Sequence, residues 1–285
     1  MAFLQRKLGE LTARIDRARR MLGLARSRRL DAARQRDLED LLARRHRWLG
    51  HPGFPQPSFA NARLIAVGPR GHGNCIVLLA GAGTRVGTAF HFARGARNNI
   101  LVIGARARAP RKVDFLASHG LVVIGEETAG LMSMDIELNS DDGLVSIGPR
   151  CNANGTSVIL QGVGQSLIVG EDCMFAMDTV IRTSDRHAIS GPDGQWMNPP
   201  ADIRIDPHVW LGEGAFVLKG VHIGTGAVVA ARSVVSRNIP PFTVAGGAPT
   251  RPLRSDIYWE RSSEPTLNDS ARWRDVADKL ENAAA

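Results

Sequence analysis

Aromatic residues and cysteines are both scarce in this chain of 285 residues. Phe, Trp and Tyr together make up 5% of it, whereas glycine occurs 30 times. This balance suits short strands and many turns better than the packing of large helices. The three cysteines, Cys75, Cys151 and Cys173, have no metal-like spacing and form no even set. A disulfide framework is therefore not expected, and a reducing compartment is favoured.

Long apolar runs are missing as well. No window approaches the ~20 consecutive apolar residues that are needed to cross a bilayer. The N-terminus, MAFLQRKLGELTARIDRARR, carries charges throughout and has no apolar core of signal-peptide length. We therefore expect a soluble, cytoplasmic protein. Its hydrophobic fraction of 44% is high enough for a substantial core, so the chain should not be disordered.

Acidic residues are outnumbered in the first fifty positions, which hold 14 Lys and Arg against 6 Asp and Glu. The whole net charge of +8 lies there, on an otherwise nearly neutral body. Apolar residues of this region recur in alternating steps of four and three, which predicts a helix with a heptad seam. The seam consists of Leu4, Leu8, Leu11, Ile15, Ala18, Leu22 and Ala25.

A second helical run follows and ends at Gly50 and Pro52. Its apolar members are Leu38, Leu41, Leu42, Trp48 and Leu49. Residues 1–50 are thus predicted to form a basic helical region, which leaves two interpretations open. The helices could pack on the body or on their own copies. Alternatively, their Arg-rich faces could bind an anionic membrane surface or an acidic polymer.

From about residue 96 onward an aliphatic side chain returns at every sixth position. The unbroken series is Ile205, Leu211, Val217, Ile223, Val229 and Val235, and Val169, Phe175 and Ile181 keep the same step upstream. Still earlier, Ile-Gly or Val-Gly dipeptides recur every 21 to 23 residues, at 103, 124, 147 and 169. A period of six is neither helical nor that of an ordinary strand. It indicates a solenoid of short strands and tight turns.

This repeat resembles that of the hexapeptide-repeat acyltransferases, whose fold is a left-handed parallel β-helix with three hexads to a coil. The resemblance covers roughly residues 96–254 and is most specific over 209–254, VWLGEGAFVLKGVHIGTGAVVAARSVVSRNIPPFTVAGGAPTRPLR. It implies a mainly β protein, with a linker and first strands over 51–95 and the β-helix over 96–254. Residues 255–285 would form a tail with a short helix near 268–281.

The six-residue step is interrupted in TSDRHAISGPDGQW, residues 183–196. The next positions in phase after Ile181 are His187, Asp193 and Pro199, and none of these is an aliphatic residue. Because Ile205 restores the phase, we interpret the stretch as a loop that leaves the solenoid and returns to it. Loops on a rigid scaffold are the usual place for binding residues.

The resemblance implies that His187 is a catalytic general base. A sugar hydroxyl is a poor nucleophile near neutral pH, and a neutral imidazole can take its proton as it attacks a thioester carbonyl. By spacing alone His187 could equally be a histidine at a coil corner. Asp185 could orient the imidazole, since residues two apart in a strand face the same way. A backbone carbonyl could do the same.

Trp210 in HVWLG is expected to point outward from its coil. With Asp206 before it, this motif is most similar to that of the capsular and sialic-acid polysaccharide O-acetyltransferases, which implies that Trp210 lies near the active-site groove. The alternative is a tryptophan packed under the 188–202 loop. His187, His208 and His222 could suggest the metal site of the γ-class carbonic anhydrases. Their separations of 21 and 14 residues lack that family's close pair, so no metal is predicted.

The resemblance also implies acetyl-CoA as co-substrate, bound in a groove between neighbouring β-helices. Small residues let the pantetheine approach the backbone, and the candidates are Gly212, Gly214, Ala230 and Ala231. Arg251, with Arg254 as a second cation, would contact the adenosine phosphate. Lys219 is a weaker candidate on the CoA side, and its alternative is a solvated lysine on an outer turn.

A site between neighbours requires an oligomer, and the resemblance implies a homotrimer. The predicted function is transfer of an acetyl group from acetyl-CoA to a sugar hydroxyl of a surface polysaccharide or its precursor. If the basic helices bind the acceptor, the acceptor would be acidic. If they bind a membrane surface instead, the protein would contact the membrane peripherally. No nucleic-acid partner is expected. The alternatives are an antibiotic-type acetyltransferase, a non-catalytic β-helix scaffold and a γ-class carbonic anhydrase. O- and N-acetylation both occur on this scaffold.

Overall fold

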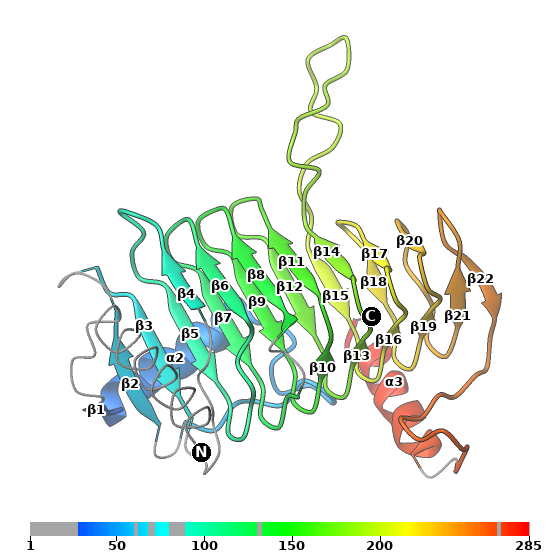
Figure 1. Cartoon of the computed structure of the whole chain (residues 1–285), viewed down its shortest axis with the longest axis horizontal. Coiled ribbons are helices and arrows are strands. Elements are labelled where there is room, and N and C mark those ends of the chain that lie inside the picture. The colour runs from blue at the N-terminus through cyan, green and yellow to red at the C-terminus, as the bar shows by residue number, and fades with distance from the viewer. Residues whose placement is uncertain are drawn as a thin grey trace, which may run out of the picture.

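The computed structural model describes residues 28–59, 62–67, 72–79, 89–129, 133–266 and 269–284. Three sheets form the faces of a prism, and the chain winds around it from the nine-stranded to the six-stranded to the seven-stranded sheet (Figure 1). Neighbouring strands are parallel, except in the β1–β2, β2–β3 and β21–β22 pairs. The protein is a left-handed parallel β-helix, as predicted.

The strands are short and are divided among the three sheets. The nine-stranded sheet holds β1 (Arg28–Arg29), β2 (Arg63–Ala66), β3 (Cys75–Leu78), β5 (Ile100–Ile103), β7 (Leu121–Ile124), β9 (Leu144–Ile147), β12 (Ser166–Val169), β15 (Ile203–Ile205) and β18 (His222–Ile223). The seven-stranded sheet holds β4 (Ala89–Phe92), β6 (Lys112–Phe115), β8 (Asp135–Leu138), β11 (Ser157–Leu160), β14 (Val180–Arg182), β17 (Phe216–Val217) and β20 (Val234–Val235). The six-stranded sheet holds β10 (Asn152–Ala153), β13 (Met174–Phe175), β16 (Trp210–Leu211), β19 (Val228–Val229), β21 (Val244–Gly246) and β22 (Arg251–Arg254).

The six-residue step produces the core, as predicted. Each member of the series from Val169 to Val235 is buried inside the prism. Ile205 pairs with Ile223, eighteen residues later, which is one coil of three hexads. Ile103, Ile124, Ile147 and Val169 pair in succession, so the 21-to-23 spacing is also one coil with a longer corner turn. The interior is thus a stack of aliphatic layers to which every coil contributes.

The parallel ladder begins earlier than the sequence analysis placed it. β3 pairs in parallel with β5, and β4 pairs with β6, so the coils start at Cys75 and not near residue 96. Residues 139–143 form a corner turn after β8. A long corner turn shifts the six-residue phase without interrupting the ladder.

Two helices cover the outer face of the nine-stranded sheet and share a second apolar core with it. α2 (Ala32–Arg45) begins at the cap Asp31, whose side chain accepts a hydrogen bond from the Arg34 amide at 2.9 Å. α3 (Ser270–Ala284) corresponds to the predicted C-terminal helix. The predicted seam over residues 4–25 lies outside the described residues. In the part of the chain that the structure describes, neither helix is long and apolar enough to cross a membrane.

Candidate active site

The interruption of the repeat forms a loop that rises from the corner between the seven-stranded and nine-stranded sheets (Figure 1). It leaves after β14 and returns at β15, and Val169 pairs directly with Ile205 across it. The loop is closed at its base, where the Ala201 amide donates to the Thr183 carbonyl at 3.0 Å. The strands before and after the loop pair with the neighbouring coils without interruption, so the loop is an insertion into an intact scaffold.

The outer part of the loop is a narrow antiparallel excursion with apolar side chains on its surface. Ser190 and Trp196 form an antiparallel bridge, and the Met197 amide donates to the Ile189 carbonyl at 2.8 Å. The side chains of Ile189, Trp196 and Met197 are nevertheless more than half exposed, with Met197 at 67%. A projecting loop with exposed large apolar side chains is typical of a surface that contacts another molecule.

His187 lies on the exposed lower part of this loop. Its backbone carbonyl accepts a hydrogen bond from the side-chain amide of Asn198 at 2.9 Å. The same amide donates to Asp185 Oδ2 at 3.0 Å, so Asn198 ties the two arms of the loop together. The sequence analysis missed Asn198, which is eleven residues from His187 and carries no spacing signal.

Asp185 and Lys219 are brought together, although the sequence analysis gave them unrelated roles. Lys219 Nζ donates to Asp185 Oδ2 at 2.5 Å and to the Asn198 carbonyl at 2.7 Å. The hydrogen bond from the Lys219 ammonium group lowers the pKa of Asp185, with the Asn198 amide and the charges of Lys219 and Arg182 acting in the same sense. The recorded partners of the Asp185 carboxylate are therefore Lys219 and Asn198, and the His187 imidazole is not among them.

Apart from Lys219, the residues expected on the CoA side occupy a different part of the prism. Trp210 lies on β16 in the six-stranded sheet, and Arg251 and Arg254 are exposed on β22 of the same sheet. Ala230 and Ala231 follow β19 at the corner with the seven-stranded sheet. The His187 loop leaves from the other edge of the seven-stranded sheet. Within one chain, the structure does not bring His187 together with these residues.

Gly212 has a packing role in its own coil. A Cβ atom on it would lie 2.7 Å from the Ala231 amide nitrogen and from the Val229 carbonyl oxygen. The glycine therefore lets two successive corner turns stack closely. This explains its small side chain without a ligand.

Trp210 packs beside the C-terminal segment. The residue is 36% exposed, and its ring lies 5.9 Å from the ring of Trp259, centroid to centroid. The alternative in which it lies under the 188–202 loop is wrong, because the loop leaves from a corner that does not border the six-stranded sheet. Trp210 thus lies in the same sheet as the exposed arginines of β22, with β19 and β21 between them.

His208 and His222 each have a carboxylate partner and lie apart from His187. The His208 ring is stacked between Trp259 at 4.1 Å and Trp273 at 4.6 Å, and its Nδ1 is 2.7 Å from Asp172 Oδ2. This stack joins α3 to the β-helix. His222 Nε2 lies 2.7 Å from Asp206 Oδ2. Among the described residues, no group of three or more metal-binding side chains occurs.

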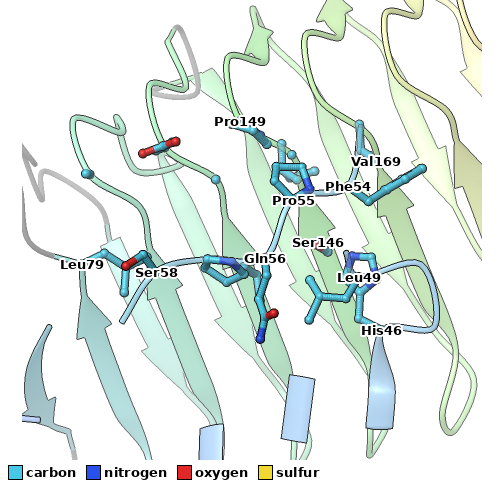
Figure 2. A pocket seen from close by; sticks show the side chains of 17 residues that line it. His46, Leu49, Phe54, Pro55, Gln56, Ser58, Leu79, Ser146, Pro149 and Val169 are labelled. Carbon is cyan, nitrogen blue, oxygen red and sulfur yellow. The ribbon is translucent and has the colours of Figure 1, made fainter. Parts of the chain in front are cut away.

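A cavity of about 340 Å³ lies on the opposite side of the nine-stranded sheet from the core (Figure 2). Residues 46–58 cross the sheet as a strap and form one wall; the sequence analysis had placed 46–50 at the end of the helical region and 51–58 in the linker. Ser146, Pro149 and Val169 contribute to the other wall. His46 lines the cavity, and its burial lowers the pKa of the imidazole to about 4. The cavity is separate from the His187 loop.

Comparison with known proteins agrees with the fold and adds enzyme relatives. No family model matches. A polysialic acid O-acetyltransferase from Escherichia coli O1:K1 / APEC is 33% identical over 103 residues, which cover 36% of this chain and 34% of the relative. A chloramphenicol acetyltransferase from Escherichia coli is 36% identical over 72 residues, which cover 25% of this chain and 33% of the relative. The chain spans about half or less of the length of the curated relatives it matches.

Among solved structures, the crystal structure of the polysialic acid O-acetyltransferase OatWY aligns with a TM-score of 0.54. The alignment covers 72% of this chain and 96% of that chain at 21% identity. At that identity the likeness concerns the fold alone. It agrees with the β-helix described above.

Proposed function

We propose that the chain is a hexapeptide-repeat acyltransferase and that it acts as an acetyl-CoA-dependent O-acetyltransferase. The acceptor we propose is a hydroxyl of a surface polysaccharide or of its precursor. The observation that carries the proposal is the placement of His187. Its loop is the one long insertion between consecutive coil strands in the part of the β-helix described from residue 133 onward, and the scaffold beneath the loop is unbroken.

His187 acts as the general base in this proposal. The exposed imidazole accepts the proton of the acceptor hydroxyl while the oxygen forms its bond to the thioester carbonyl carbon. The C–S bond then breaks, and the proton passes to the departing thiolate. General bases of this kind contribute typically ~10²–10⁴-fold to the rate. Asn198 and Lys219 position the loop, since Asn198 binds the His187 carbonyl and Lys219 binds Asp185.

The described residues fit acetyl-CoA as a donor, with two changes to the set expected from the sequence. Arg251 and Arg254 are exposed on one strand and available to a phosphate group, and Ala231 is exposed on the adjacent turn. Lys219 is bonded to Asp185 and to the Asn198 carbonyl, so we assign it to the loop. Gly212 serves the packing of the coil.

We propose that the complete site forms between two copies in a trimer. One copy provides His187, and its neighbour provides the groove beside Trp210, Arg251 and Arg254. Two observations support this arrangement. The seven-stranded sheet separates the two sets within one chain. The loop also carries the exposed Trp196 and Met197 side chains, which a neighbouring copy would cover.

The test is thiol release from acetyl-CoA, measured across acidic polysaccharides, neutral sugars and chloramphenicol. We expect turnover on a glycan that falls by at least about a hundredfold in His187→Ala, because a positioned base is lost. His91→Ala is the matched control, since His91 is an exposed histidine on β4, away from the loop. If wild type and His187→Ala turn over a glycan equally fast, His187 is not the base.

An antibiotic-type acetyltransferase is the second candidate function, and the chloramphenicol acetyltransferase relative favours it. It would use the same residues, so only the acceptor separates the two. Turnover of chloramphenicol without turnover of any glycan would replace the first proposal with this one. A scaffold without a donor site would instead show no binding of CoA by calorimetry.

A further inference from the structure

Four arginines line a groove that leads to the base of the His187 loop. Arg44 and Arg45 are in the last turn of α2, Arg47 follows it, and Arg204 lies on β15. Together they line a groove of about 500 Å³ on the outer side of the nine-stranded sheet, which we call the arginine groove. It is separate from the residues proposed for the donor, which lie on the six-stranded sheet.

The arginine groove follows the corner of the prism from which the loop rises. Arg45 donates to the carbonyls of His119 and Asp142, which are in the corner turns of two successive coils. The groove then passes Gly164 in the next turn and reaches Asp202, where the loop rejoins the β-helix. Since adjacent coils are about 4.8 Å apart, these turns form a continuous path that crosses several coils.

Two of the four arginines are held within the protein. Arg45 is anchored by the backbone carbonyls just described. Arg204 Nε donates to Asp206 Oδ1 at 2.6 Å, and its guanidinium lies 3.4 Å from the centroid of the Trp48 ring. Their positions are therefore set by the fold, and the Asp206 carboxylate offsets the charge of Arg204.

The other two arginines have guanidinium groups that no carboxylate of the described residues neutralises, and Arg47 lies over the Trp48 ring at 5.5 Å from its centroid. Arg44 and Arg47 are exposed, and neither forms an ion pair with a carboxylate among the residues that the structure describes. Basic residues at a helix C-terminus complement the helix dipole, which accounts for Arg44 and Arg45. It does not account for Arg47, which is beyond the helix, or for Arg204 on a strand. Asp142 and Asp202 leave the lining with an excess of positive charge.

We propose that the arginine groove binds an acidic polysaccharide and leads its chain to the His187 loop. This inference rests on the proposed acetyltransferase function and specifies its acceptor as a polyanionic glycan. Arginine forks suit the carboxylate groups of such a chain, because they can form paired hydrogen bonds with each one.

Two other polyanions fit the groove less well. A membrane surface requires an exposed apolar face beside the basic one, but the apolar lining residues Leu144, Ile168 and Ile203 are all buried. A single-stranded nucleic acid requires aromatic faces for its bases. Trp48 is buried, and guanidinium groups of Arg204 and Arg47 lie over its ring.

The test compares Arg44→Gln/Arg47→Gln with wild type in binding fluorescently labelled polysialic acid. We expect affinity to fall by roughly tenfold or more, since two charge-assisted contacts are lost. Wild-type binding should also weaken strongly between about 50 mM and about 500 mM NaCl, because salt screens exposed charges. Arg106→Gln/Arg108→Gln is the matched control, because it removes two exposed charges between β5 and β6, and it should bind like wild type.

The outcomes separate this inference from the proposed function. Unchanged affinity in Arg44→Gln/Arg47→Gln overturns the arginine groove, as does tighter binding of wild type to phosphatidylserine vesicles or to DNA. Thiol release with a neutral monosaccharide should be the same in wild type and Arg44→Gln/Arg47→Gln. If wild type transfers acetyl groups but binds no acidic glycan, the groove fails and the function stands. If it binds the glycan but releases no thiol with any acceptor, the function fails and the groove stands.

Discussion

Replacing Lys219 by methionine distinguishes a loop-positioning residue from a donor contact. Methionine retains an unbranched apolar side chain but removes the ammonium group that donates to Asp185 Oδ2 and to the Asn198 carbonyl. The Lys219 side chain is 19% exposed and the Asp185 side chain 38% exposed. Because Asp185 is partly solvated, the ion pair contributes at the low end of charge-assisted interactions, about 1 kcal/mol. The bond to the Asn198 carbonyl brings the total loss to about 1–2 kcal/mol.

That loss would appear in catalysis, since the two bonds hold the two arms of the loop that carries His187. We expect kcat to fall by about 5- to 30-fold in Lys219→Met, if the loss is expressed in the positioning of the base. The KM for acetyl-CoA should be unchanged. Asp185→Asn, which keeps the shape but removes the charge, should lower kcat in the same sense and by less.

Steady-state kinetics with acetyl-CoA as the varied substrate checks this prediction. If Lys219→Met raises the KM for acetyl-CoA and leaves kcat at the wild-type value, Lys219 contacts the donor and the assignment to the loop is refuted. Binding of CoA by calorimetry gives a readout independent of turnover. It should give the same Kd for wild type and Lys219→Met.

Three further predictions concern stability. Gly212→Ala should destabilise the fold by about 1–3 kcal/mol in urea unfolding, because the new Cβ would overlap the turn at Ala231. A wild-type free energy of unfolding together with a raised KM for acetyl-CoA would contradict the packing role of Gly212. His208→Ala should lower the free energy of unfolding by about 3–5 kcal/mol and loosen the attachment of α3, because it removes the ring that stacks on Trp259. Hydrogen exchange of the α3 amides measures that loosening. Burial lowers the pKa of His46 to about 4, below its unfolded value of ~6.5, so only the unfolded state gains a proton between those values. Stability should therefore be complete above pH ~6.5 and fall by about 2 kcal/mol by pH ~5, and a His46→Phe variant should lose this dependence.

The β-helix could be predicted because one physical requirement is repeated along the chain. Each coil face needs one inward aliphatic side chain, so Ile205, Leu211 and Val217 recur in phase and are buried side by side. First strands were expected over 51–95, but the β-helix itself was placed from residue 96, because the six-residue phase cannot be read in the first coils; β3 already pairs in parallel with β5. Periodicity records the interior of a solenoid and contains no information on the length of its turns.

The loop could be located from the sequence, but its internal contacts could not. A break in phase before His187 indicates an insertion, whatever residues it contains. The bond between Lys219 and Asp185 joins residues 34 apart that face each other only after the coil has closed. Similarly, the distance of His187 from Arg251 depends on which corner the loop leaves, and only the order of the sheets specifies that corner.

Complementation between two inactive variants tests the shared site most directly. His187→Ala and Arg251→Ala/Arg254→Ala should each release little thiol alone, because each lacks one half of every site. In trimers assembled at random from equal amounts of both, about one site in four combines an intact His187 with an intact neighbouring groove. The account predicts that co-expressed variants recover about a quarter of the wild-type rate of thiol release. A rate no higher than that of the two variants measured separately would contradict a site built from two copies.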